Sequence, residues 1–571
     1  MATTVVVRRL LLLVVGLVLS GCSLGSGSDE PGSDAAGPES SAITTPTTSD
    51  ASRTTSPSTT AVGEQGSRQE LRTELVDGRW EILDGDGATV RWEAVNVRSD
   101  QFIEVPNRRL APLSSGHVDD MTELFNSVRL VIRWDQLEPN DNDYNTELLG
   151  EICSFLNNAH TASNDAIPAP LQVILDPVHI GGGAGTNAFV PLFAWEQVLP
   201  GVEPVINNTF GFWEAALTET DTPWLDYLDY IMSESTCVGP DGTSTTLGQH
   251  PAVVAIELMN EPHPKQPFVE DGEMVSTGGA TSDYNQGLHM LVYDRGISRV
   301  RALDNGRPDI PIVVGAYFGG HFYDRDEGPD NQNWLAALTT ANFTAQAEAT
   351  ANRQFPAAAP LTVDIAQAHQ NLIWTAHSYF TGVSSDDAGT CLTADETCLL
   401  ERNGANSDYD GNGLPDPDGQ GERGVRASGL WSENFASQGC YGYPQPERNE
   451  CDAPDDERRR IATIGHRANA AAHDRIAQGA AMPFFLGEWG IPALTNGTGW
   501  RFAEEFFCDK LVAFDSARTE AAGDRGEPGV AVSWAVWAFD DRVDGRFGLY
   551  SPDTEQWRDI AAPFADASCT G

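Results

Sequence analysis

Two carboxylates stand out because each follows a short apolar run and lies in a motif containing Asn, Pro, Gly or Trp. Glu261 lies in Glu257-Leu258-Met259-Asn260-Glu261-Pro262, and Glu488 lies in Phe485-Leu486-Gly487-Glu488-Trp489-Gly490. Two carboxyl groups can hydrolyse a glycosidic bond, because one is protonated and releases the leaving oxygen while the other is ionised and attacks. Close carboxyl groups raise one pKa, whereas a nearby Arg or hydroxyl keeps the other ionised. Arg129, His377 and Tyr379 are suited to that second role.

Further polar residues stand where apolar runs end. One charged residue in such a place usually only begins a loop. Here seven runs end in groups able to catalyse or to bind a sugar, namely Asn96, Arg129 with Arg133, Asp176 with His179, Asn260 with Glu261, His377 with Tyr379, Glu488, and Trp537. The Trp537 indole also offers a flat apolar face for a sugar ring. We therefore interpret these residues as parts of one site.

The apolar runs alternate with helical patterns from residue 80 onward. Eight runs are expected to be central strands, at 92–96, 128–133, 171–176, 253–260, 312–317, 372–379, 483–488 and 531–537. Helical patterns between them include 146–159, 285–303, 458–478 and 502–517. This alternation is typical of a parallel sheet buried on both faces, and eight units predict a (β/α)8 TIM barrel. An open doubly wound sheet is the alternative, but no Gly-rich phosphate motif follows the first strand.

The residues before the first central strand and the long loops also carry signals. Residues 80–83, 84–87 and 88–90 are expected to form a hairpin that caps the barrel bottom. Long insertions at 180–222 and 380–457 follow the third and sixth strands, on the face where loops set specificity in barrels. The second insertion resembles a calcium loop, with oxygen ligands at Asp408, Asp410, Asn412 and Asp416. The alternative for that segment is a solvated acidic turn.

The N-terminus has the features of an export signal. Arg8 and Arg9 precede the apolar run 10–19, and Leu19-Ser20-Gly21-Cys22 is similar to a bacterial lipobox, in which the Cys is acylated. We expect a lipoprotein signal peptide at 1–21, a disordered Ser/Thr/Gly/Pro-rich tether at 22–66 and a catalytic barrel at 67–571. The protein is then exported and anchored to the cell surface through Cys22, or else secreted. An ordinary signal peptide with a chance Cys is the alternative.

Composition limits the partners. The 571-residue chain has a formal net charge of −48, which argues against nucleic-acid binding because that function needs a basic surface. Beyond the N-terminus no apolar run is long enough to span a bilayer, so membrane contact is expected only through the lipid anchor. We expect a monomer whose partner is a carbohydrate.

The cysteines predict disulfides. Nine Cys less the lipidated Cys22 leave an even number, which suits an oxidising compartment. Metal binding by these cysteines is the weaker interpretation because neither CxxC nor HExxH occurs. The expected pairs are Cys153 with Cys237, Cys391 with Cys398, Cys440 with Cys451, and Cys508 with Cys569.

The ordered set of motifs resembles glycoside hydrolase family 5, in the clan of retaining (β/α)8 glycosidases with Glu on strands four and seven. The resemblance covers roughly residues 78–565. It implies that Glu261 is the acid/base and Glu488 the nucleophile, about 5–5.5 Å apart. It also implies supporting roles for Arg129 beside the nucleophile, His179 in the −1 subsite, Asn260 at the sugar 2-hydroxyl, His377 and Tyr379 on strand six, and Trp537 as a sugar platform.

One departure from the family concerns strand three. The family has Asp-x-His there, whereas this chain has Asp176-Pro177-Val178-His179, which is one residue longer. The family resemblance implies hydrolysis of β-glycosidic bonds in a polysaccharide or oligosaccharide such as β-glucan, cellulose or mannan, by double displacement. No cofactor is expected for catalysis, and a structural calcium ion is the one metal considered. A catalytically silent carbohydrate-binding lipoprotein and a transglycosylase are the alternatives.

Overall fold

A computed structural model describes the chain in part, and the description below is confined to that part. The described residues are 70–102, 113, 116–162, 170–178, 189–198, 200–201, 222–260, 268–270, 273–275, 283–303, 307–315, 369–379, 470, 474, 477–478, 480–491, 503–515, 530–540, 547–552, 554–565 and 569. The chain divides into two units, Met1–Gly63 and Glu64–Gly571, and all described residues lie in the second. Several expectations fall outside them: the signal peptide, the tether, Cys22, the pairs 391–398 and 440–451, and the calcium-like loop with Asp408, Asp410, Asn412 and Asp416.

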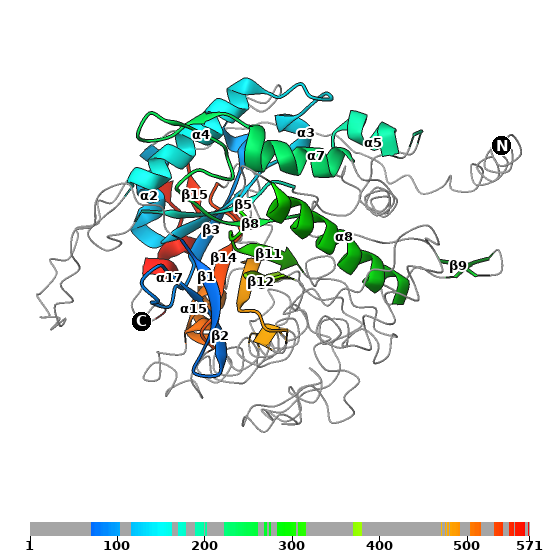
Figure 1. Cartoon of the computed structure of the whole chain (residues 1–571). Coiled ribbons are helices and arrows are strands. Elements are labelled where there is room, and N and C mark those ends of the chain that lie inside the picture. Colours follow the sequence, from blue (N-terminus) through cyan, green and yellow to red (C-terminus); the bar gives the residue numbers. More distant parts are fainter. Residues whose placement is uncertain are drawn as a thin grey trace, which may run out of the picture. The chain divides into compact units, whose positions relative to one another are not determined.

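Eight parallel strands form a closed barrel at the centre of the described structure (Figure 1). Each strand pairs with the next along the chain, and the last pairs with the first. The strands are β3 (Glu93–Arg98), β4 (Ser127–Val131), β5 (Gln172–Asp176), β8 (Val253–Glu257), β11 (Ile312–Gly315), β12 (Leu372–Tyr379), β13 (Phe484–Gly490) and β14 (Ser533–Val536). The predicted TIM barrel is confirmed, and each expected strand is present with modest shifts of its ends.

Helices surround the barrel, as Figure 1 shows for α4, α7 and α8. The described helices are α2 (Gly116–Leu124), α3 (Trp134–Leu137), α4 (Thr146–Thr161), α5 (Leu192–Val198), α7 (Pro223–Asp229) with a π-helical turn (Tyr230–Glu234), α8 (Asp283–Ala302), α15 (Ala503–Phe514) and α17 (Ala562–Ala565). Three expected helices correspond to α4, α8 and α15, and the described residues of the fourth, at 470, 474 and 477–478, are helical. None of the described helices is both long and apolar enough to cross a membrane.

Helix α4 illustrates why these segments form helices against the barrel. Its N-cap Asn145 accepts a hydrogen bond from the backbone N–H of Leu148, which satisfies one of the free donors of the first turn. Leu148, Ile152 and Leu156 recur every four residues and are fully buried. This stripe packs in the same core as the outward-facing side chains of β4. One face of the helix and one face of the strand therefore share an apolar interface.

The barrel interior has an apolar layer and, two residues further along the strands, a polar layer. The lower layer is fully buried and is formed by Ala94, Ile174, Ala255, Val313, Ile373, Phe485 and Ala535. Adding two to these numbers on β3, β5, β8 and β12 gives Asn96, Asp176, Glu257 and Thr375, because side chains of one face recur with period two. The carboxyl ends of the strands therefore place polar groups together above an apolar floor.

The hairpin under the barrel differs from the prediction. Strand β2 (Arg79–Leu83) pairs mainly with an upstream strand, β1 (Arg72–Val76), and the expected partner segment makes a single bridge between Leu83 and Thr89. The turn between β1 and β2 is Asp77-Gly78, with φ of 52° and 88°, the left-handed geometry of a tight hairpin turn. Leu71 and Ile82 pack with Trp92 below the apolar layer, so the hairpin closes the barrel bottom as expected.

Two predicted disulfides are present. Cys153 bonds Cys237, and Cys508 bonds Cys569. Cys153 lies inside α4 and Cys237 lies in the two-residue strand β6 (Cys237–Val238), which pairs with β7 (Ser244–Thr245). Disulfides are typical of proteins that mature in an oxidising compartment, as exported proteins do.

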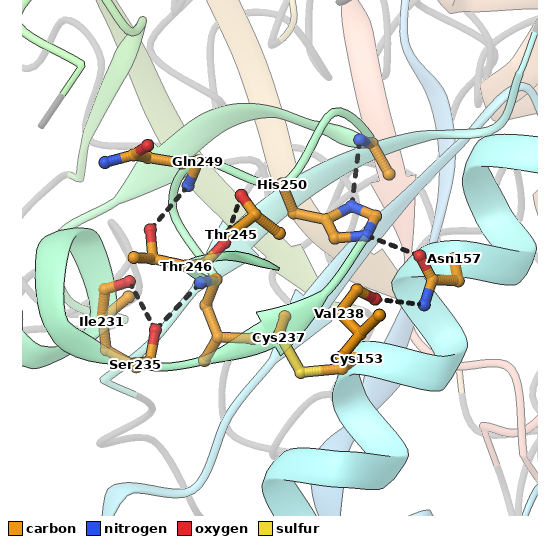
Figure 2. Close-up of a disulfide and its surroundings, with 12 residues drawn as sticks. Cys153, Asn157, Ile231, Ser235, Cys237, Val238, Thr245, Thr246, Gln249 and His250 are labelled. Atoms are coloured by element: carbon orange, nitrogen blue, oxygen red, sulfur yellow. Dashed lines mark hydrogen bonds between the residues drawn. A yellow bond between two sulfur atoms is a disulfide. The ribbon is translucent and has the colours of Figure 1, made fainter. Parts of the chain in front are cut away.

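Asn157 reinforces the Cys153–Cys237 link one turn further along α4 (Figure 2). Its Nδ2 donates to the carbonyl of Val238 at 2.8 Å, and its Oδ1 lies 3.1 Å from Nε2 of His250. The other ring nitrogen of His250 accepts from the backbone N–H of Ala252 at 3.2 Å, so the proton of the neutral ring is on Nε2. Burial lowers the pKa of His250 to about 4, which keeps the ring neutral. Helix α4 is thus tied to the segment that leads into β8.

Replacing Cys153 and Cys237 together by Ala should lower the free energy of unfolding. The bond spans a sequence separation of 84 residues, and opening a loop of that size restores chain entropy worth about 4.5 kcal/mol to the unfolded state. Urea unfolding under non-reducing conditions measures the difference. An unchanged midpoint and slope would contradict this stabilising role.

Candidate active site

The polar layer is buried at the carboxyl ends of the barrel strands. Each of its members is at most 3% exposed: Asn96, Arg129, Asp176, Glu257, Asn260, Thr375, His377 and Glu488. They come from β3, β4, β5, β8, β12 and β13, with Asn260 in the loop after β8. Residues separated by hundreds of positions are therefore brought to one end of the barrel, where TIM-barrel active sites lie.

Arg129 is the centre of this layer. Its Nε donates to Oε2 of Glu257 at 2.7 Å. Its Nη1 donates to Oε1 of Glu488 at 2.7 Å and to Oδ1 of Asn96 at 3.0 Å. Its Nη2 donates to Oδ1 of Asn260 at 2.6 Å and to Oδ2 of Asp176 at 3.1 Å. One planar guanidinium thereby fixes five side chains from different parts of the barrel.

Strand geometry explains why Arg129 points inward. Val128 and Leu130 pack outward in the helix-facing core, so the residue between them faces the interior. A fully buried guanidinium is costly unless charged partners and hydrogen bonds compensate for lost water. Burial alone lowers the pKa of Arg129, but Glu257, Asp176 and Glu488 outweigh it and raise that pKa well above its usual value. Arg129 is therefore a permanent cation in the layer.

The charges of the layer are unequal, because one Arg faces three carboxyl groups. Burial raises the pKa of Asp176 to about 7, against the lowering effect of Arg129, and Glu488 adds to the rise. Burial likewise raises the pKa of Glu257 to about 7, again opposed by Arg129 and assisted by Asp176. Near neutral pH each of these two carboxyls is therefore close to its own pKa, so the net charge around Arg129 depends on pH.

A bulge in β13 turns Glu488 toward Arg129. On the neighbouring strand Ala376 pairs with Leu486 but His377 pairs with Glu488, so Gly487 is an extra residue. Strict alternation from the inward Phe485 would place Glu488 outside. Because of the extra residue, Glu488 reaches the guanidinium, and Trp489 packs outward in the helix-facing core.

The two glycines of the motif allow neighbouring strands to approach closely. A Cβ on Gly487 would lie 2.5 Å from Oγ1 of Thr375, which accepts a 3.1 Å hydrogen bond from the Gly487 N–H. A Cβ on Gly490 would lie 2.9 Å from the carbonyl oxygen of Trp537. The Gly-Glu-Trp-Gly motif therefore has a steric reason for each glycine, in addition to the carboxylate between them.

His377 and Trp537 complete the described site. Nδ1 of His377 lies 3.5 Å from Oε2 of Glu488, the oxygen that Arg129 leaves open in its own contact. Trp537 is 8% exposed and packs with Val131, Ala538 and Phe547, and its backbone N–H donates to the carbonyl of Trp489 at 2.8 Å. The peptide bond between Trp537 and Ala538 is cis. Both residues stand at the strand ends that the sequence predicted.

Three predicted site residues are not tested by this geometry. Glu261 and His179 lie outside the described residues, and Tyr379 is described only as the last backbone position of β12. Arg133 is described, but it lies apart from the Arg129 contacts. Its Nη2 bonds Asp135 at 2.6 Å, and its guanidinium carbon is 4.0 Å from the centre of the Phe189 ring.

The sequence reasoning missed Glu257 as a site residue and did not assign a role to Asp176 or Asn96. A signal for Glu257 was present, because it is a charged residue inside an apolar run, two positions after the inward Ala255. An ionisable side chain at an inward barrel position must have a buried partner. That partner, Arg129, belongs to another strand and could not be identified from spacing alone.

Comparison with known proteins gives a mixed result. No protein-family model matches the chain, and no curated protein matches its sequence. Among solved structures, Thermotoga maritima Cel5A in complex with cellobiose is 12% identical, with 83% of this chain and 96% of that chain covered and a TM-score of 0.39. An endogalactoceramidase is 14% identical, with 88% and 84% covered and a TM-score of 0.42.

A third similar structure is the endoglucanase Cel5A of Pseudomonas stutzeri, 14% identical, with 84% of this chain and 95% of that chain covered and a TM-score of 0.36. Likeness at this level of identity and superposition carries no functional argument.

The raised pKa values of Asp176 and Glu257 predict a pH dependence of stability. Each carboxyl keeps its proton in the folded chain up to about pH 7, whereas in the unfolded chain it loses the proton near pH 4. The contribution of these groups is fully present below about pH 4 and is lost as the pH rises to about 7. Urea unfolding across this range should show a smaller decline for the double variant Asp176→Asn/Glu257→Gln than for the wild type.

The exposed Glu151→Gln variant on α4 is the control for that comparison, since it removes one carboxyl without touching the site. It should follow the wild-type curve. Parallel curves for the wild type and the double variant would show that neither buried carboxyl has a raised pKa.

Proposed function

We propose that this chain is a retaining β-glycosidase related to glycoside hydrolase family 5, with Glu488 as nucleophile and Glu261 as acid/base. The observation that carries the proposal is the double contact of Arg129. Its guanidinium holds the Glu488 carboxylate at 2.7 Å and the Asn260 amide oxygen at 2.6 Å. Asn260 directly precedes Glu261, so one cation links the nucleophile candidate to the backbone that carries the acid/base candidate.

The contacts of Glu488 suit a nucleophile. The guanidinium at Oε1 stabilises the carboxylate form, and Oε2 faces His377 at a longer distance of 3.5 Å. In the first step an oxygen of Glu488 bonds to the anomeric carbon while the bond to the leaving oxygen breaks. The leaving oxygen keeps the electron pair and takes the proton of Glu261. Arg129 keeps Glu488 in place throughout, because its donors do not have to reorganise.

The second step reverses the roles. Glu261, now ionised, accepts a proton from water, the water oxygen bonds to the anomeric carbon, and Glu488 leaves as a carboxylate. Asn260 supports sugar binding in this scheme. Its side chain is fully buried, and within the described residues its Nδ2 has no hydrogen-bond partner, so that donor is available for a sugar hydroxyl. The indole of Trp537, a residue that is 8% exposed, provides an apolar surface for the same sugar.

The proposed substrates are β-linked polysaccharides or oligosaccharides such as β-glucan, cellulose or mannan. A transglycosylase would use the same covalent intermediate with a sugar hydroxyl in place of water. A catalytically silent carbohydrate-binding protein is the alternative from a different class, and the presence of both Glu residues in their motifs argues against it. Reducing-sugar release from a panel of polysaccharides, together with the length of the products, separates these three.

The proposed location is the outside of the cell. The disulfides of the barrel suit an oxidising compartment. Acylation of Cys22 would anchor the protein, with residues 22–66 as the tether. A calcium ion on Asp408, Asp410, Asn412 and Asp416 remains part of the proposal and has no role in the chemistry.

Removal of the two carboxylates should have different effects. Glu488→Ala should lower turnover by several orders of magnitude on every β-glycoside, because no nucleophile remains. Glu261→Ala should still form the intermediate from an aryl glycoside with a good leaving group, and added azide should restore its breakdown. The exposed Glu147→Ala variant on α4 is the control and should match the wild type. Substantial turnover by Glu488→Ala would refute the assignment.

The stereochemistry of the first product should be retained. The short separation expected between Glu261 and Glu488, about 5–5.5 Å, leaves no room for the water of an inverting mechanism. NMR of a β-glycoside reaction, recorded before the product equilibrates, should therefore show the β-anomer first. An initial α-anomer would exclude the covalent mechanism.

A further inference from the structure

We propose that Glu257 is a positioning residue, which sets the orientation of the Arg129 guanidinium so that its two terminal nitrogens face Glu488 and Asn260. The inference rests on the proposed function, because the positioned groups are the nucleophile and the residue before the acid/base. It concerns a side chain that touches neither the sugar nor the reacting atoms in the scheme above.

Glu257 contacts a different nitrogen of the Arg129 guanidinium from the other four partners. Each terminal nitrogen of Arg129 contacts two groups, Nη1 with Glu488 and Asn96 and Nη2 with Asn260 and Asp176. Nε contacts Glu257 at 2.7 Å and no other group within the described part of the chain. Because the guanidinium is planar, a partner fixed at Nε determines where Nη1 and Nη2 point.

Arg129 also contacts both ends of the segment 257–260, which leads to Glu261. Glu257 is the last residue of β8, and Asn260 follows three positions later. Arg129 bonds Glu257 through Nε and Asn260 through Nη2, while the Asn260 backbone N–H donates to the carbonyl of Val178 at 2.9 Å. The segment is therefore held around the guanidinium at two points. A displaced Glu257 carboxyl moves Arg129 relative to Glu488 and to this segment together.

Position matters more than charge for this role. Three carboxyls share one cation, and burial raises the pKa of Glu257 to about 7, so the group is partly neutral near neutral pH. The charged and titratable groups acting on it are Arg129 from β4, Asp176 from β5 and His377 from β12, and it acts in turn on Tyr293 of α8. A neutral carboxyl or amide oxygen also accepts from Nε, and Oε1 of Glu257 has no hydrogen-bond partner within the described residues. A proton on Oε1 therefore leaves the contact at Oε2 intact.

Two conservative variants separate position from charge. Glu257→Gln keeps the side-chain length and an oxygen acceptor, and should lower kcat by less than roughly tenfold, since the Arg129 cation still donates to the amide oxygen and only the negative charge of the acceptor is lost. Glu257→Asp keeps the charge but withdraws the carboxyl by one methylene, and should lower kcat by about 100-fold with little change in KM. Equal losses in both variants, or a greater loss in Gln than in Asp, would overturn the inference.

An ion pair between buried Asp474 and partly exposed Arg79, far from the site, is the matched control. Asp474 is 5% exposed and binds Arg79 of the bottom hairpin through two hydrogen bonds of 2.6 and 2.7 Å. Asp474→Asn should lower the Tm, as loss of a buried charge does, without changing kcat. If Asp474→Asn lowers kcat as much as Glu257→Asp does, the effect of Glu257 is only a general loss of stability.

A crystal structure of Glu257→Asp tests the same inference without any turnover. We expect the distance between Nη1 of Arg129 and Oε1 of Glu488 to lengthen beyond hydrogen-bonding range, from 2.7 Å in the wild type. If the Arg129 contacts with Glu488 and Asn260 are unchanged, the inference is wrong, whether or not the wild type hydrolyses glycosides. Absence of glycosidase activity in the wild type would instead refute the proposed function, so the two failures are distinguishable.

Discussion

A single buried cation facing three carboxyl groups constrains the rest of the described site. Arg129 has no access to water, so its charge must be compensated by groups within hydrogen-bonding distance. Those groups come from β3, β5, β8 with its following loop, and β13, and each strand must therefore end at the right height. A buried guanidinium without partners would destabilise the folded state, so segments that are far apart in the chain must lie close enough to Arg129 to bond it.

One barrel strand, β13, is irregular where it brings its carboxylate to Arg129. The four interior positions named above, on β3, β5, β8 and β12, follow simple alternation above the apolar layer, but Glu488 can reach Arg129 only because the extra residue Gly487 shifts β13 against β12. A side chain at Gly487 would collide with Thr375, and one at Gly490 would collide with the carbonyl of Trp537. The irregularity in β13 thus lies beside Glu488, the carboxylate that has to face inward, and the neighbouring strands leave room for it only because Gly487 and Gly490 have no side chains.

The sequence predicted the barrel well because continuous apolar runs and helical patterns are local signals, and the apolar runs at 372–379 and 253–260 are strong ones. It also named Arg129, Asn260, His377, Glu488 and Trp537 as site residues, and the structure has them within or shortly after β4, β8, β12, β13 and β14. It did not predict that Glu257 and Asp176 share Arg129 with Glu488, because spatial pairing across three strands leaves no trace in spacing. The β1 strand was missed because the Asp77-Gly78 turn was not recognised as the start of a hairpin.

The closed floor of the barrel has a consequence for proton traffic. Leu71, Ile82 and Trp92 cover the apolar layer from below, and that layer is itself without exposed atoms beyond a few per cent. Within the described residues, this floor gives the carboxyls around Arg129 no route to water from below. Proton exchange at Asp176 and Glu257 then depends on the carboxyl ends of the strands, the end where TIM-barrel active sites lie. Under the proposed function a bound sugar lies at that same end and slows this exchange, so the pH of the medium acts mainly on the empty protein.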